Sequence, residues 1–133
     1  MTRLEYWIRA QTQYSVHSPF VFDLYREVLF AEVAHASLPP CRWGSRRYSA
    51  LCYKLKDHFG LTTIAATDQQ AVFSGTADFG MVLVVNHPHR DNAAEQRWAD
   101  LCRTEPYRVS IDLYDVGLLF TNPRLHRQHF LLK

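Results

Sequence analysis

The first 60 residues carry apolar side chains at intervals of three and four, which is the spacing of one face of an α-helix. This spacing predicts helices in three places. The first covers residues 2 to 12 and is a short amphipathic helix, with apolar positions at Leu4, Trp7 and Ile8. The last begins near Ser45 and ends at Gly60, because glycine commonly lies just past the end of a helix. Its apolar positions are Tyr48, Leu51, Cys52, Leu55 and Phe59.

Between them, the pair Ser18-Pro19 predicts the start of another helix. The hydroxyl of Ser18 can accept an unpaired backbone N–H of the first turn, and proline suits the first helical position. We expect this helix to reach about Val33. Residues 36 to 45 are predicted to be a loop, because two prolines and a glycine exclude regular structure. We interpret His17, which precedes the cap, as structural, with a role in an active site as the alternative.

After Gly60 the pattern changes to short β-branched, continuous or alternating runs, which predict strands. The expected strands are 61–67, 71–74, 81–85, 108–114 and 117–122, with HFLLK at the end of the chain as a possible edge strand. The run MVLVV at 81–85 is typical of a strand buried on both faces. A helix is predicted from near Asn92, with Glu95 as a capping-box partner, and Pro106 closes it.

These elements predict one α/β domain over residues 1–133, with a helical part at 1–60 and a sheet at 61–133. We expect a small sheet of about four or five strands. A buried strand, a crossover helix and a further strand form a βαβ unit, which is expected to be right-handed. The short turns after Tyr114 indicate an antiparallel C-terminal ribbon.

Composition narrows the class of protein. Of the 133 residues 47% are hydrophobic and 14% aromatic, as in a folded globular chain. A formal net charge of +2 with scattered basic residues makes nucleic acid an unlikely partner. The three cysteines are odd in number and far apart, which favours reduced thiols in a cytoplasmic protein over a disulfide framework. The N-terminus does not have the pattern of a signal peptide, and no apolar run approaches membrane-spanning length.

Two blocks of the sequence carry a family resemblance. Near the start stands YWIRAQTQYSVHSPFVFDLYREVLF, and at the end stands AEQRWADLCRTEPYRVSIDLYDVGLLFTNPRLHRQHFLLK. Both blocks resemble class I S-adenosylmethionine-dependent methyltransferases of Bacteroidetes-type bacteria. The two blocks cover roughly half the chain. MVLVVNHPHRD lies where that family has its last parallel strand. The resemblance implies a truncated Rossmann-like sheet with an antiparallel last strand.

The same family holds its cofactor on a glycine-rich turn directly after the first strand, because a Cβ would obstruct the ligand. Here the first predicted strand ends with Ala66 and Thr67 and is followed by Asp68, and the next glycine is Gly75. These three residues are the candidates for cofactor binding. Family members also tend to place acidic residues after the strand that corresponds to MVLVV, where this chain has Asn86 and His87. We therefore expect no bound cofactor, and keep His17, Asn86 and His87 as candidate catalytic residues.

Other side chains suggest metal or nucleophile chemistry. The pairs His87/His89 and His126/His129 could ligate zinc if they converged with Asp91, but we interpret them as solvent-exposed loop histidines. Cys52 and Cys102 fall on apolar helix faces and are expected to be core residues. Cys41, beside Arg42, is the candidate nucleophile, because a neighbouring cation lowers a thiol pKa.

A truncated sheet leaves apolar area that a partner would cover. The candidate interaction surface consists of Phe20, Phe22, Phe30 and Trp7. Trp43 and Trp98 are also considered as surface residues, and core packing is the alternative for the phenylalanines. Asp112 is expected on a solvated strand face with Ser110 and Tyr114.

Three hypotheses for function follow. The first is a non-catalytic methyltransferase relative that acts as a binding or regulatory subunit, as a homo-oligomer or with a protein partner. The second is an active methyltransferase that binds S-adenosylmethionine in a remodelled or dimer-interface pocket. The third is a nucleic-acid-binding adaptor, for which salt-dependent binding would be the signature.

Overall fold

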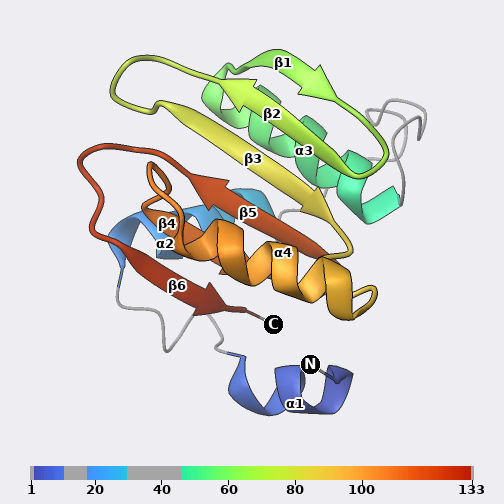
Figure 1. Ribbon diagram of the computed structural model, residues 1–133. Helices are drawn as coiled ribbons and strands as arrows, with labels where there is room; N and C mark the ends of the chain where they lie inside the picture. The colour runs from blue at the N-terminus through green and yellow to red at the C-terminus, as the bar shows by residue number, and fades with distance from the viewer. Residues whose placement is uncertain (1, 11–17, 30–45, 133) are drawn as a thin grey trace.

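The computed structural model describes residues 2–10, 18–29 and 46–132, and Figure 1 shows their arrangement. The predicted N-terminal helices are confirmed in these ranges. They are α1 (Arg3–Arg9), α2 (Pro19–Leu24), which continues into the π-helical turn η2 (Tyr25–Leu29), and α3 (Arg46–Phe59). None of the helices in the described ranges combines the length and apolar character needed to cross a membrane.

The predicted strands are also confirmed, and they form a six-stranded open sheet, somewhat larger than the four or five strands expected. The strands are β1 (Thr62–Ala66), β2 (Gln70–Ser74), β3 (Met81–Asn86), β4 (Val109–Asp112), β5 (Val116–Phe120) and β6 (Gln128–Leu131). Their order across the sheet is β1-β2-β3-β5-β4-β6. The first three strands form an antiparallel meander joined by short connections.

The crossover helix α4 (Asn92–Arg103) leads from β3 to β4. These two strands run in the same direction, because β5 lies between them and is antiparallel to both. β4 and β5 therefore form the expected antiparallel pair. The sixth strand departs from an antiparallel ribbon: β6 lies at the edge of the sheet, where a longer loop lets it return parallel to β4.

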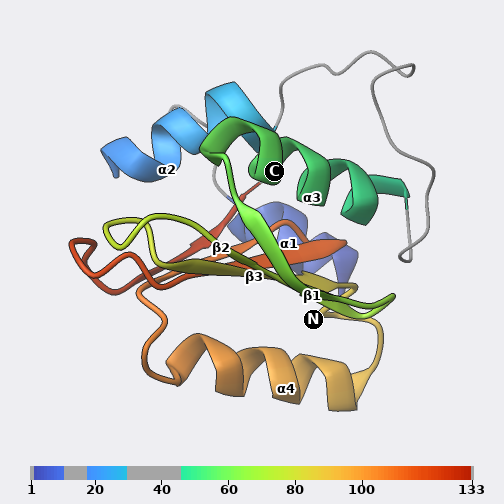
Figure 2. The ribbon, with the colours of Figure 1, turned by 90° about the horizontal axis from the view of Figure 1, so that it is seen from above.

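Helices cover both faces of the sheet, as the second view shows (Figure 2). The α2 and α3 side holds the larger core, which includes Leu24, Tyr48, Leu55, Phe73 and Phe120. On the other face, α4 forms a smaller cluster in which Trp98 packs with Leu83 and Leu119. Trp98 is 4% exposed, so its assignment as a surface residue was wrong: the indole fills the layer between α4 and the sheet.

Local hydrogen bonds explain where the helices begin and end. The Ser18 hydroxyl accepts from the Val21 amide at 3.4 Å, as predicted for the start of α2. After α3, Gly60 has φ +63° and the Leu61 amide bonds to the Lys56 carbonyl, which is a glycine-dependent helix end. At α4 the cap is Asp91, whose carboxylate accepts from the Ala94 amide at 2.7 Å.

The predicted capping-box role of Glu95 was wrong. Asp91 is the N-cap, which puts Glu95 one position beyond the capping-box position. The Glu95 carboxylate instead contacts the ring of His89, which precedes the helix. This contact belongs to the polar cluster described next.

Candidate functional site

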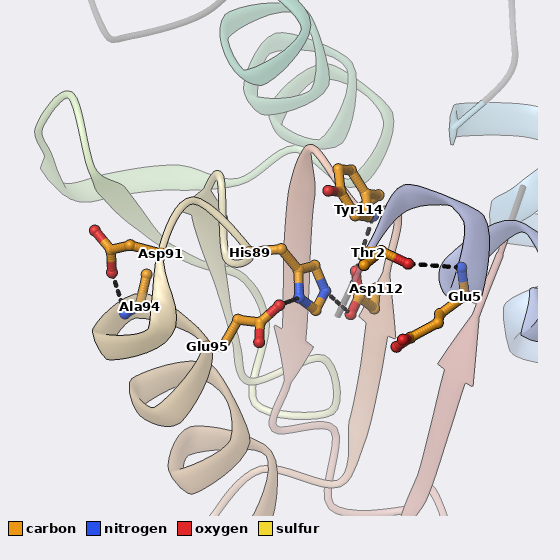
Figure 3. Close-up of polar contacts among 8 residues, drawn as sticks. All are labelled: Thr2, Glu5, His89, Asp91, Ala94, Glu95, Asp112 and Tyr114. Atoms are coloured by element: carbon orange, nitrogen blue, oxygen red, sulfur yellow. Dashed lines mark hydrogen bonds and ion pairs between the residues drawn. The ribbon is translucent and has the colours of Figure 1, made fainter.

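A histidine held between two carboxylates is the most elaborate polar arrangement in the described residues (Figure 3). His89 lies in the loop between β3 and α4, and its side chain is only 6% exposed. Its Nδ1 is 2.8 Å from Oε1 of Glu95, and its Nε2 is 2.5 Å from Oδ2 of Asp112. The cluster thus joins the loop, the first turns of α4 and the end of β4.

The contacts of His89 define its charge. Each ring nitrogen lies within hydrogen-bond distance of a carboxylate oxygen, and this arrangement favours the imidazolium, whose two N–H groups can both donate. Burial lowers the pKa of His89, but the hydrogen bonds and negative charges of Asp112 and Glu95 outweigh burial and raise it above its ordinary value. With both nitrogens engaged, His89 is not poised to take a proton from a substrate.

Asp112 connects this cluster to the backbone. Its second oxygen, Oδ1, accepts from the amide of Tyr114 at 2.8 Å. Tyr114 has φ +69°, an unusual conformation for this residue type, and its ring stacks on His89 at 5.2 Å and 18°. Asp112 is 1% exposed, so the expectation that it lies on a solvated face was wrong. The polar face of β4 is real, but α4 and its preceding loop cover it.

The same cluster holds α1 against the sheet. The Tyr6 hydroxyl donates to the backbone carbonyl of Asp112 at 2.9 Å, and its ring packs edge-on against Tyr114 at 5.2 Å. Arg3 lies over the Tyr114 ring at 4.5 Å and donates to the carboxylate of Asp115 at 3.0 Å. Aromatic and polar contacts therefore fix one side of α1.

The opposite side of α1 is apolar and exposed. Leu4 is 69% exposed, Trp7 60% and Ile8 72%. The amphipathic pattern predicted for residues 2 to 12 is present in α1. The side of the helix that packs on the protein is the one with Tyr6, and the apolar side with Leu4 faces outward. Trp7, a predicted interaction residue, thus lies on the most exposed apolar surface described.

The candidate cofactor-binding residues lie where β1 turns back into β2. Ala66 ends β1, and Thr67 and Asp68 begin a tight turn into the antiparallel strand β2. The Thr67 hydroxyl accepts from the amides of Gln69 and Gln70, both at 3.2 Å. The Thr67 carbonyl accepts from the Tyr48 hydroxyl at 3.0 Å. These polar groups are directed at the protein itself.

Asn86 and His87 lie at the end of β3 beside this turn. The side-chain amide of Asn86 donates to the backbone carbonyl of Asp68 at 3.0 Å. His87 is exposed and has φ +50°. Both residues line a small cavity of about 70 Å³ between the turn, the end of β3 and α4. The structure thus brings two of the candidate catalytic residues together, but not with His89 and Asp112.

The four candidate metal-binding histidines do not form a centre. His87 and His126 are exposed, as expected, whereas the interpretation of His89 as exposed was wrong because its ring bridges two carboxylates. His129 on β6 shares a 2.6 Å hydrogen bond with buried Ser110 on β4. Within the described ranges, no three His, Cys, Asp or Glu side chains are placed to hold a metal ion.

Cys52 is buried in the larger core, and Cys102 is partly buried against the smaller cluster. Burial raises the pKa of Cys52 to about 12 and that of Cys102 to about 11, which favours the unreactive thiol.

Phe20 and Phe22 are partly buried and pack against the larger core. The remaining predicted positions, which lie outside the described residues, are His17, Phe30, Cys41 and Trp43.

Comparisons with known protein families, with curated proteins and with solved structures find no match for this chain. The chemistry of its own residues therefore carries the functional argument.

Proposed function

We propose that this chain is a non-catalytic binding subunit, shortened from a methyltransferase of the class I S-adenosylmethionine-dependent type, and that it assembles with a second copy of itself through α1. The exposed apolar face formed by Leu4, Trp7 and Ile8 carries this proposal. Contiguous exposed apolar side chains on a small protein commonly mark an interaction site. The opposite side of α1 is docked on Asp112, so the helix presents its apolar face in a defined direction.

The arrangement of the C-terminal half supports the proposed ancestry. β5 lies antiparallel between β3 and β4, which agrees with the antiparallel ribbon expected after Tyr114, whereas the last strand, β6, is parallel to β4. The N-terminal half of the sheet differs, because β1 leads into a hairpin rather than a crossover. The turn after β1 uses Thr67 in place of a glycine-rich loop, which supports the loss of cofactor binding.

The polar cluster supports a non-catalytic role. A general base needs a nitrogen or oxygen that can accept a proton near the operating pH. Both nitrogens of His89 are engaged by carboxylates, and Asp112 is buried under α4. The arrangement is suited to hold α1, the β3–α4 loop and β4 in place.

The charges on α1 favour a second copy of this chain as the partner that covers its apolar face. Glu5 lies in the first turn and Arg9 in the last turn, one helical turn apart on the same flank of the apolar face. When two such helices pack antiparallel about a two-fold axis, Glu5 of one copy comes close to Arg9 of the other. A two-fold interface buries the same apolar patch on both copies.

Sedimentation velocity across a concentration series tests this proposal. We expect a dimer whose dissociation constant rises at least about tenfold in Ile8→Glu, because the carboxylate would be buried in the interface. Ile64→Glu is the matched control: Ile64 is 60% exposed but lies on β1, so the dimer should persist. A wild-type monomer at every concentration, or equal dissociation of both variants, would overturn assembly through α1.

Calorimetric titration with S-adenosylmethionine tests the non-catalytic part separately. We expect no binding. Micromolar affinity would replace this proposal with the active methyltransferase, whether or not the chain is a dimer.

A further inference from the structure

The small cavity beside α4 has a distinctive lining. Its walls come from the β1–β2 turn, the end of β3 with the following loop, and one side of α4. The polar and cationic members are Gln69, Gln70, Asn86, His87, Arg90 and Arg97. An apolar wall is formed by Val85, Pro88, Ala94, Trp98 and Leu101.

The charged side chains that line this cavity are all positive. Arg90 and Arg97 supply two guanidinium groups, and no acidic side chain of the described chain lines the cavity. Arg90 has an exposed ion pair with Asp91 at 3.4 Å, which is a weak contact in water. Arg97 forms no ion pair within the described ranges, although its charge, after the Ala94 amide and Arg90, helps to lower the pKa of the exposed Asp91 carboxyl.

The cavity lies beside the start of α4, but it does not use the backbone amides of the helix N-terminus as ligand contacts. The carboxylate of Asp91 already occupies that position, where it accepts from the Ala94 amide. The candidate ligand contacts are therefore side chains from three segments, not the helix dipole. Asp68 belongs to the neighbouring turn but does not line the cavity. Its charge acts on Tyr48, whose pKa is raised first by burial, then by Cys52 and by Asp68.

The size of the cavity limits the ligand. A volume of about 70 Å³ accommodates a group of a few heavy atoms. Sites for drug-sized molecules are larger, at roughly 300–1,000 Å³. Guanidinium groups pair with phosphate through parallel N–H···O bonds, and two of them match the charge of a phosphate dianion.

We propose that this cavity, between the β1–β2 turn and α4, is a binding site for a phosphate group, with Arg90 and Arg97 as its charged contacts. The phosphate comes either as the free ion or as the terminal group of a small ester. The two glutamines of the lining carry amide groups that can donate to its oxygens, and Trp98 and Leu101 belong to the apolar wall against which the organic part of an ester would lie. The site does not depend on assembly through α1, which lies on the other side of the His89 cluster.

An NMR titration at constant ionic strength tests the proposal, following the backbone amides of Gln70, Asn86 and His87. Inorganic phosphate, added in exchange for chloride, should shift these signals with saturation. In Arg97→Gln the affinity should fall about tenfold, because one of two charge-assisted contacts is lost. Arg103→Gln is the control: Arg103 is also an exposed arginine of α4 but does not line the cavity, so its affinity should match the wild type.

Phenyl phosphate in the same titration distinguishes the two sources. Tighter binding of phenyl phosphate than of inorganic phosphate would support an ester whose organic part lies on Trp98, and equal binding would support the free ion. The proposal is overturned if phosphate produces no saturable shift, or if Arg97→Gln and Arg103→Gln respond alike, since the effect is then a general response to anions.

Discussion

At the scale of the residue, the unusual feature of this chain is a buried pair, His89 and Asp112, extended by the partly exposed carboxylate of Glu95. His89 and Asp112 have side chains that are 6% and 2% exposed, and such groups are costly to bury unless they are paired and hydrogen-bonded. Glu95 supplies the second negative charge from α4. The triad therefore stabilises one arrangement of loop, helix and strand, and removing either His89 or Asp112 leaves the other buried without its main partner.

The charge of His89 predicts a pH dependence of stability. Its pKa is raised in the folded state, so the folded chain binds this proton more tightly than the unfolded chain. The stabilisation is fully present below the ordinary pKa of about 6.5 and is lost as the pH rises through the raised value. Urea unfolding at a series of pH values from about 6 to 9 should show this decline in the wild type.

His89→Gln tests the same point. We expect it to lower the unfolding free energy by about 3 kcal/mol at the acidic end, because Asp112 is left buried without a positive partner. The alkaline decline should be smaller in this variant. His87→Gln, an exposed histidine two residues away, should keep both the stability and the pH profile of the wild type. Equal behaviour of the two variants would contradict the triad's role.

At the scale of the element, α1 depends on its partners more than on its own sequence. It has only seven residues, from Arg3 to Arg9, and helices this short are marginal in isolation. Its Thr2 cap accepts from the Glu5 amide at 3.1 Å, and the contacts of Tyr6 and Arg3 attach it to the end of β4 and the residues that follow. The position of the proposed assembly face is thus determined by the buried side of the helix.

Tyr6→Phe should loosen α1 while leaving the rest of the fold in place. The variant removes the hydroxyl that donates to the Asp112 carbonyl, a contact worth about 1 kcal/mol. Hydrogen exchange of the α1 amides should accelerate accordingly. Leu4→Ala, on the exposed side of the same helix, is the control and should leave α1 exchange in the monomer close to wild type. Protection that is unchanged in Tyr6→Phe would show that this contact does not hold the helix.

At the scale of the whole molecule, the two faces of the sheet are covered unequally. The α2 and α3 side carries the larger core, and in the described part of the chain the other face packs against α4. That helix can approach β5 closely because residue 117 is glycine. A Cβ at Gly117 would lie 2.5 Å from the Trp98 ring, which is closer than two carbon atoms can pack.

Gly117→Ala should therefore destabilise the layer between α4 and the sheet. We expect a loss of about 1–3 kcal/mol in unfolding free energy, as is usual when a well-packed site is overfilled. Trp98→Leu removes the ring that would clash, so adding Gly117→Ala in that background should cost clearly less. Denaturant unfolding of the four proteins measures this coupling, and strictly additive effects would show that the two residues do not compete for space.

Local sequence determined most of the elements. The three- and four-residue spacing around Tyr48 and Leu55 predicts α3, and Gly60 marks its end, because periodicity and helix ends depend on near neighbours. The same is true of the Ser18 cap and of the strand MVLVV. The predicted crossover between β3 and β4 is also confirmed, since a helix between two strands leaves few alternatives.

Tertiary structure decided the rest. Alternation in β4 separates Asp112 from Ile111, but it does not reveal that α4 covers the polar face and makes that carboxylate buried. Likewise, the spacing of Leu4, Trp7 and Ile8 identifies an apolar face, but only the docking of Tyr6 on Asp112 turns that face outward. The parallel return of β6 and the pairing of His89 with Asp112 join residues far apart in the chain. Such contacts depend on how the layers stack, and a local pattern carries no information about that.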